Sequence, residues 1–164
     1  MLNDRLRQIN NRLGRNINRE VVIQQALKEV RDFLDIDRVA LYYFYKQWKG
    51  QVTVENLKSS EFSILGETGA DECFNDRYAV LYEEGRVRAI ADIETEPIHS
   101  CHRDFLRSIQ VRANLVVPIL SSQGLWGLLA AHHCTAPRIW TASEIQFMQK
   151  KAEILAKLPA IENS

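Results

Sequence analysis

The 164-residue chain has little cysteine, little proline and no excess of charge of either sign. Its three cysteines are an odd number and no C-x-x-C spacing occurs, which argues against a secreted disulfide framework, a zinc ribbon and a thioredoxin-type redox pair. Twenty-one basic residues balance 21 acidic ones, so the net charge indicates neither a nucleic acid nor an anionic membrane as partner. No apolar run approaches the roughly 20 residues that span a bilayer, and the N-terminus lacks a signal-peptide core. We therefore expect a cytoplasmic protein.

The length predicts one domain over residues 1–164. Helical spacing of apolar residues predicts a short helix over 3–13 within a leading segment 1–17, a second helix from Asn18 to about Leu34, and a C-terminal linking helix over 142–158. Two hairpins are expected between these helices, at 38–57 and 114–134, with a long loop, small helices and a short strand separating them. The order predicts an α+β fold of three layers, α/β/α, with a central antiparallel sheet and a pocket against the middle segments.

Two cysteines lie in distinctive settings. Cys73 is part of Asp71-Glu72-Cys73-Phe74 at the end of the long loop, and Cys101 precedes His102 in the first turn of a predicted helix with Ser100 as N-cap. A helix N-terminus and a protonated imidazole both lower the pKa of a thiol, so Cys101 is a candidate nucleophile. Two thiols in separate segments could reach one bound molecule. Cys134, in an apolar strand-like run, is instead expected to be a small buried hydrophobe.

Five segments together resemble the GAF domain of the cyanobacteriochrome photoreceptors, which are bilin-binding relatives of phytochromes. The pair Cys101-His102, followed by Phe105-Leu106, resembles the bilin attachment site of that family. The segment 71–74 resembles the Asp-x-Cys-Phe motif of a dual-cysteine subfamily. The remaining resemblance lies in the segments 85–93, 125–134 and 137–140. Each motif alone is weak evidence, whereas their joint order and spacing are specific.

The resemblance implies a covalently bound linear tetrapyrrole, phycocyanobilin or phycoviolobilin or both, linked by a thioether to Cys101. It implies a second, reversible linkage from Cys73 to the central methine bridge. Such a sensory domain photoconverts between a blue- or violet-absorbing state and a green- to orange-absorbing state through double-bond isomerisation. Attachment and any isomerisation of the bilin to phycoviolobilin would be autocatalytic, so we do not expect an enzyme.

The same resemblance suggests further residues around the bilin. Expected contacts with its rings are His102, Asp71, Phe74, His132, Tyr82 and Trp140. Candidate partners of its propionates are Arg77, Arg86 and Arg88. Because side chains alternate along a strand, only one of His132 and His133 can face the pocket, and His132 is favoured. Each aromatic residue could equally be ordinary core, and each arginine could be a solvated surface group.

Other functions stay open at this point. The domain could sense a small molecule other than a bilin, act as a thiol-dependent GAF-type reductase of free methionine sulfoxide, or serve only for dimerisation. The photoreceptor reading also implies a C-terminal output domain in a longer protein, and a homodimer formed through the terminal helices.

Overall fold

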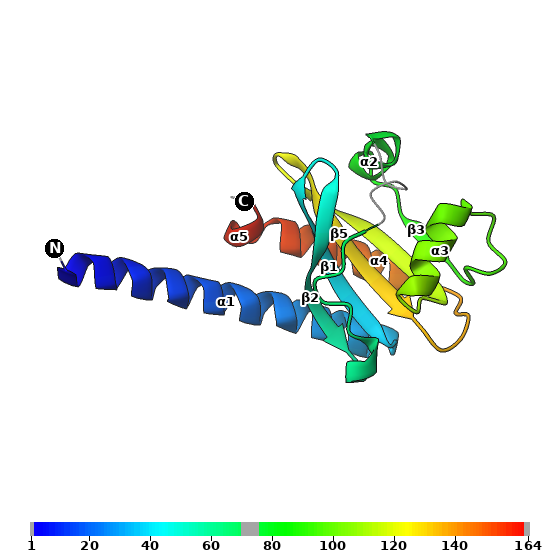
Figure 1. Ribbon diagram of the computed structural model, residues 1–164, viewed down its shortest axis with the longest axis horizontal. Coiled ribbons are helices and arrows are strands. Elements are labelled where there is room, and N and C mark those ends of the chain that lie inside the picture. The colour runs from blue at the N-terminus through cyan, green and yellow to red at the C-terminus, as the bar shows by residue number, and fades with distance from the viewer. Residues whose placement is uncertain (1, 70–75, 163–164) are drawn as a thin grey trace.

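The computed structural model describes residues 2–69 and 76–162, which form a five-stranded sheet with helices on both faces (Figure 1). In chain order the elements are α1 (Leu2–Leu34), β1 (Arg38–Lys46), β2 (Lys49–Leu57), the 3-10 helix η1 (Ser60–Phe62), α2 (Asp76–Glu83), β3 (Arg88–Ile90), α3 (Ser100–Ser108), β4 (Ala113–Ser121), β5 (Gly124–His133), α4 (Ala142–Ala156) and α5 (Pro159–Glu162). The predicted α+β class with a central antiparallel sheet is confirmed. Among the described residues, no helix combines the length and the apolar character that crossing a membrane requires.

The sheet has the strand order β2-β1-β5-β4-β3, and every neighbouring pair is antiparallel. The two predicted hairpins supply four of the strands, and β3 pairs with the outer edge of β4. Successive side chains point to opposite faces of a strand. In β1, Val39 and Leu41 therefore face one side of the sheet, and Arg38 and Ala40 face the other.

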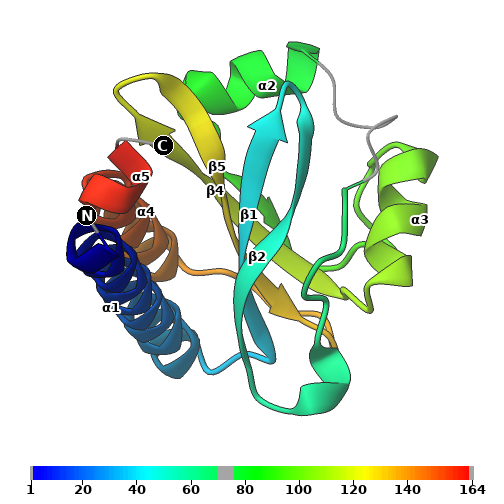
Figure 2. The ribbon, with the colours of Figure 1, turned by 60° about the vertical axis from the view of Figure 1, so that its left-hand side comes forward.

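Helices α1 and α4 cover the first side, which we call the α1/α4 face (Figure 2). The predicted stripe of α1 packs here: Leu27 and Val30 are almost fully buried. On α4, Met148 and Leu155 are buried in the same cluster. Fully burying a side chain of this size stabilises a fold by roughly 1.5–3 kcal/mol. This face therefore holds the main hydrophobic core.

Helices α2 and α3 lie on the opposite side, the α2/α3 face (Figure 2). Two smaller apolar clusters fill it, one including residues of β1, β3 and α3 and the other residues of α2, β4 and β5. Their members include, respectively, Ala40, Ile90, Leu106 and Ile109, and Ala79, Tyr82, Val116 and Ala130. The middle segments of the chain thus form the third layer, as predicted.

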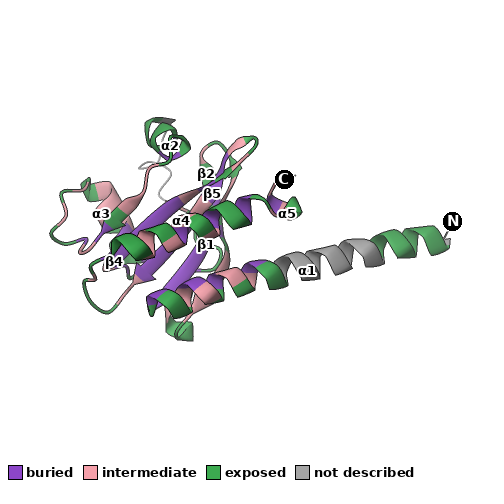
Figure 3. Cartoon of the chain, turned by 180° about the vertical axis from the view of Figure 1, so that it is seen from behind, coloured by how far each residue is buried: buried purple, intermediate pink, exposed green. Residues whose placement is uncertain are grey.

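Helix α1 differs from the expectation of two separate helices, because it runs without a break from Leu2 to Leu34. Asn18 is not the N-cap of a second helix, because an ordinary residue such as asparagine costs a helix interior at most about 0.7 kcal/mol, against about 3 for proline. The first proline of the chain is Pro97. The N-terminal half of α1 extends away from the sheet (Figure 1), and Leu6 and Ile9 are exposed there (Figure 3).

Helix α4 begins as the sequence predicts. Thr141 and Glu144 form a reciprocal capping box, in which each side chain accepts a hydrogen bond from the backbone N–H of the other. The helix ends at Ala156, however, and Pro159 opens the short helix α5 instead of closing α4. Proline suits the first position of a helix because its missing N–H would have no intrahelical partner there.

Candidate functional site

The start of α3 presents the expected attachment residues. The predicted N-cap, Ser100, is wrong by one position: His99 caps the helix, and its Nδ1 accepts a hydrogen bond from the backbone N–H of Cys101 at 3.1 Å. Ser100 has already entered the helix. Cys101 still lies in the first turn, where the unpaired N–H groups of a helix favour a negative charge.

The expectation of a protonated imidazole beside Cys101 is wrong. Burial lowers the pKa of His102 to about 4, and the nearby Arg88 and Arg86 lower it in the same direction. His102 is therefore neutral at pH 7 and cannot stabilise a thiolate by its charge. Cys101 is half-buried at the start of the helix.

Two of the three propionate candidates lie beside this histidine. Arg86 and Arg88 are half-buried and act electrostatically on both His102 and Tyr82, so these four side chains form one group around β3, α2 and α3. The third candidate, Arg77, is exposed on α2. Half-buried guanidinium groups beside a neutral histidine suit a ligand that carries carboxylates.

Tyr82 is buried on α2 and packs in the cluster that contains Val116 and Ala130. Burial raises the pKa of its hydroxyl, and the Arg86 guanidinium carbon lies 5.7 Å from the centre of its ring. Tyr82 is thus on the α2/α3 face, as a chromophore contact would require. Whether it contacts a ligand stays a prediction.

The place of Trp140 favours the alternative of ordinary core. Trp140 belongs to the apolar cluster of the α1/α4 face, and its indole N–H donates to the carbonyl of Ile90 at 3.0 Å. Its ring also lies 4.5 Å below the guanidinium of Arg138. This side chain fixes the segment after β5 to β3, so the structure lends no support to its predicted contact with a bilin.

The two adjacent histidines of β5 have opposite surroundings. His132 is buried on the α2/α3 face, and its Nδ1 accepts a hydrogen bond from Arg38 Nε at 3.0 Å. His133 points to the other side, where its Nδ1 lies 3.4 Å from an Asp37 carboxylate oxygen. The histidine that faces the middle segments is therefore the one favoured from the sequence, although its role in ligand binding is still a prediction.

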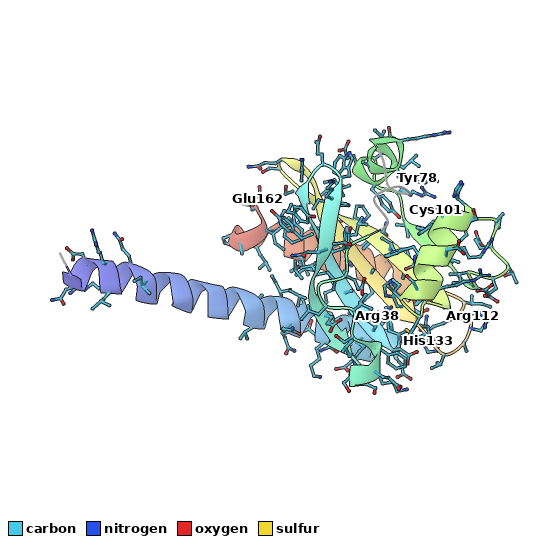
Figure 4. All side chains as sticks on the ribbon, viewed as in Figure 1. Arg38, Tyr78, Cys101, Arg112, His133 and Glu162 are labelled. Atoms are coloured by element: carbon cyan, nitrogen blue, oxygen red, sulfur yellow. The ribbon has the colours of Figure 1, made fainter. Side chains whose placement is uncertain are left out.

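Sequence reasoning missed Arg38, the largest of the fully buried side chains. Besides His132, its guanidinium donates to the carbonyls of Phe62 and Ile109, both at 2.7 Å. Arg38 and Cys101 thus lie at opposite ends of α3 (Figure 4). The signal that could have revealed Arg38 is a cation in an otherwise apolar and aromatic strand, because a charge at such a position is rarely buried without partners.

The other predicted cysteine motif, Asp71, Cys73 and Phe74, lies outside the described residues. The last described residue before it, Gly69, donates its N–H to the hydroxyl of Tyr42 at 2.8 Å. A Cβ at position 69 would lie 2.5 Å from that oxygen, so the close approach requires glycine. Tyr42 packs against the cluster beneath α3, which fixes Gly69 to the α2/α3 face.

Cys134 is a free, half-buried thiol whose pKa is raised by burial. Its backbone N–H donates to Asp37 at 2.8 Å, which fixes the end of β5. A thiol with a raised pKa is a poor nucleophile, in agreement with the structural role expected for it.

Comparison with known proteins gives the family. The GAF domain family matches residues 18–157. An uncharacterized protein of Picosynechococcus sp. (strain PCC 7002) is 52% identical over 95% of this chain and 96% of its own length. A putative methyl-accepting chemotaxis protein of Synechocystis sp. is 40% identical over 85% of this chain, but the chain spans only 14% of that protein.

Solved structures agree with this assignment. The blue-light absorbing form of the Thermosynechococcus elongatus PixJ GAF domain superposes with a TM-score of 0.77 and 31% identity, over 89% of each chain. The phycocyanobilin-bound GAF domain of a cyanobacterial phytochrome superposes with a TM-score of 0.78 and 31% identity, over 97% of this chain and 92% of the other. The chain therefore belongs to the GAF domain family, and among its members it matches the GAF domains of cyanobacteriochromes and phytochromes.

Proposed function

We propose that this domain is a photoreceptor module that binds a linear tetrapyrrole covalently and switches reversibly between two absorbing states. The observation that carries the proposal is the grouping around the start of α3: Cys101 in the first helical turn, a neutral His102 beside it, and Arg86 and Arg88 close enough to lower the pKa of that histidine. Solved relatives at 31% identity include a phycocyanobilin-bound domain. The same cofactor, or its isomer phycoviolobilin, is proposed here.

The side chains of the α2/α3 face fit such a ligand. A linear tetrapyrrole carries two propionates, and the half-buried Arg86 and Arg88 can each bind a carboxylate with two parallel hydrogen bonds. His102 is neutral, so one ring nitrogen can accept a hydrogen bond while the other donates one. That suits a row of pyrrole nitrogens better than an imidazolium would, since imidazolium has no acceptor.

Attachment is an addition that needs no oxidant or reductant. The sulfur of Cys101 bonds to one carbon of the ethylidene double bond on the first ring, and the thiol proton is transferred to the conjugated system. The start of α3 favours the thiolate that makes this bond. Because the imidazole beside it is uncharged, we expect attachment to be faster at alkaline than at neutral pH.

The second thiol supplies the colour change in this proposal. When bound, the pigment supplies light absorption and isomerisation of a double bond. Cys73 would add its sulfur to the central methine carbon and its proton to a pyrrole nitrogen of the same conjugated system. Light-driven elimination would break these two bonds and restore the free thiol. Adding sulfur interrupts the conjugation, so the state with two thioether bonds absorbs blue or violet and the state with one absorbs green to orange. Support for this step is the Asp-x-Cys-Phe motif alone.

We also propose that the domain works within a longer signalling protein and is not an enzyme. The chemotaxis relative, of which the chain spans 14%, supports an output domain elsewhere in the chain. Homodimer formation through α1 and α4 is part of the proposal, and packing changes in the middle segments would pass to these helices. A GAF domain that senses another small molecule, or a thiol-dependent reductase, is the alternative.

Coexpression with phycocyanobilin biosynthesis, followed by purification, tests the proposal. We expect a coloured protein whose band fluoresces with zinc on a denaturing gel, and whose blue or violet absorption is replaced by a longer-wavelength band after illumination. Cys101→Ala should remove the zinc-fluorescent band unless Cys73 alone retains the pigment. Cys73→Ala should keep the pigment and lose the blue or violet state.

Cys134→Ala is the matched control, since it removes a thiol that is not part of the site and should leave both absorption bands unchanged. A colourless protein that consumes methionine sulfoxide would favour the reductase. Pigment that survives acid urea in the Cys73→Ala/Cys101→Ala double variant would contradict thioether attachment through either residue.

A further inference from the structure

Helix α3 begins with an N-cap that only one protonation state of its side chain can provide. His99 has extended backbone angles, and its Nδ1 accepts the backbone N–H of Cys101 at 3.1 Å. A backbone N–H can only donate, so this Nδ1 carries a lone pair and no proton. A protonated imidazole has an N–H on both nitrogens and no acceptor. The hydrogen bond to Cys101 therefore exists only while the ring of His99 is neutral with its proton on Nε2.

Helix α4 shows how the more usual kind of N-cap differs. The hydroxyl of Thr141 accepts the backbone N–H of Glu144 at 3.2 Å, and a hydroxyl can accept this bond whatever the pH near neutrality. Histidine is instead the side chain whose charge ordinarily changes between about pH 5 and 8. His99 is exposed, so protons from the solvent reach its ring without any rearrangement of the fold. The start of α3 is thus sensitive to pH in a way that the start of α4 is not.

The body of α3 is held in place independently of this N-cap. The guanidinium of Arg103 donates to two carbonyls of the loop before the helix, that of Ile93 at 2.9 Å and that of Glu96 at 2.7 Å. On the other side of the helix, Leu106 is buried in the apolar cluster beneath it. Loss of the N-cap would therefore loosen only the first turn of α3, and Cys101 lies in that turn.

Other charged and titratable groups lie near His99. In the two segments that meet there, the loop before it and the first half of α3, these groups are Glu94, Glu96, Cys101, His102, Arg103 and Asp104. Glu94 and Asp104 both pair with Arg107. Arg86 and Arg88 act on His102, whose pKa of about 4 keeps its ring neutral above pH 5. A change in the first turn of α3 near neutral pH is therefore not caused by His102.

We propose that His99 is the positioning residue for Cys101: its neutral ring holds the first turn of α3 in place for pigment attachment, and protonation of the ring releases that turn. Protonation removes the acceptor for the Cys101 N–H. It also adds a positive charge at the helix N-terminus, where the partial positive charge of the N–H groups repels it. These N–H groups favour the thiolate of Cys101 only while the turn is helical. The identity of the attached group rests on the proposed function, whereas the capping does not.

An NMR titration of the full chain without pigment, from about pH 8 to about pH 5, tests the capping. At the alkaline end we expect the ring of His99 to carry its proton on Nε2. As the ring titrates, the amide proton of Cys101 should move upfield with the same midpoint. His99→Asn keeps an uncharged acceptor at the N-cap and should abolish this transition. The amide of Glu144, capped by Thr141, is the internal control and should not follow the ring in either protein. A proton on Nδ1 at the alkaline end, or a Cys101 amide that does not respond to the ring, would refute the proposal.

The rate at which added phycocyanobilin attaches to the purified chain tests the positioning. His99→Ala and His99→Asn are both uncharged at position 99, so a difference between them reflects the N-cap alone. At saturating pigment, His99→Ala should slow attachment by about fivefold, the factor that corresponds to a typical N-cap, and His99→Asn should restore the rate. The half-saturating pigment concentration should stay the same in all three proteins. If His99→Ala attaches pigment as fast as the unmodified chain, Ser100 has replaced His99 as N-cap and the positioning role is refuted.

These outcomes separate the inference from the proposed function. If phycocyanobilin does not attach to the unmodified chain, the proposed function fails, and the NMR titration alone decides whether the neutral ring of His99 holds Cys101. If pigment attaches at the same rate to all three proteins, the positioning role fails and the photoreceptor proposal stands.

Discussion

The same strands bury different kinds of side chain on the two faces of the sheet. The α1/α4 face buries a continuous set of aliphatic side chains, among them Leu27 and Met148, each 0% exposed. The α2/α3 face buries Arg38, His132 and Asn114 and keeps His102 half-buried beside two arginines. Buried polar groups weaken a fold unless they are paired. The comparison indicates that one face supplies most of the hydrophobic stabilisation, which allows the other to carry buried polar groups.

The largest expected effect is on the α1/α4 face. Leu27→Ala removes buried methyl groups and leaves a cavity, so the free energy of unfolding should fall by about 2–5 kcal/mol. Val22→Ala is a control on the same helix, because Val22 is exposed and its truncation should change stability little. Denaturant titration measures both. If Leu27→Ala shifts the pigment absorption as strongly as it lowers stability, the division between the faces is wrong.

A pH effect comes next, and it belongs to the α2/α3 face. The pKa of His102 is about 4 in the folded protein against 6.5 as its ordinary value, so the unfolded chain binds the extra proton first as pH falls. The free energy of unfolding should therefore decrease between pH 6.5 and about pH 4, by at most ~3 kcal/mol. His132, whose pKa is also lowered by burial, contributes in the same direction.

His102→Gln isolates this contribution from that of the carboxylates that titrate near pH 4. Urea titrations of both proteins at several pH values should give a shallower decline for the variant. Parallel curves for the two proteins would show that His102 is as exposed in the folded as in the unfolded state.

A smaller effect is expected where the end of α1, the start of α4 and the segment after β5 meet. Arg138 donates to the carbonyl of Leu34 at the end of α1 at 2.6 Å, pairs with Glu144 at the start of α4, and stacks on Trp140. Arg138→Leu should lower the free energy of unfolding by roughly 1.5–3 kcal/mol, the usual contribution of hydrogen bonds to a charged group. Thermal melts measure it. Arg138→Lys, which keeps the charge but not the planar fork, should restore only part of the loss.

Most of the fold followed from local signals in the sequence. The Thr141 and Glu144 capping box and the turn glycines Gly85 and Gly124, both with positive φ, each act over a few residues. The apolar stripes of α1 and α4 predicted the face that each helix buries. The prediction of two separate helices in place of α1 was wrong because asparagine, the expected N-cap, weakens a helix without forcing it to end.

Less of the candidate site could be predicted, because its chemistry depends on tertiary contacts. The sequence placed Cys101 and His102 correctly in the first turn of α3, but not the charge of His102, which follows from burial and from arginines 14 and 16 residues earlier in the chain. The hydrogen bonds of Arg38 could not be predicted, because its partners come from β5 and from the end of α3, which are distant in the sequence. The packing of Trp140 on the α1/α4 face likewise depends on tertiary contacts that the sequence does not reveal.

The unbroken helix α1 extends well beyond the sheet, so a small rotation of the helix at the sheet would move its N-terminal end by a much larger distance. Ile23 is the first buried residue among those of α1 whose burial the structure describes, and the stretch from there back to Leu2 spans about 32 Å at 1.5 Å per residue. A stiff rod anchored at one end magnifies angular displacement, so a tilt of ~5° at the anchor would carry the tip nearly 3 Å sideways. Sub-ångström rearrangements next to the sheet would thus displace the N-terminal end of α1 by several ångströms, enough to change its contacts with a neighbouring domain.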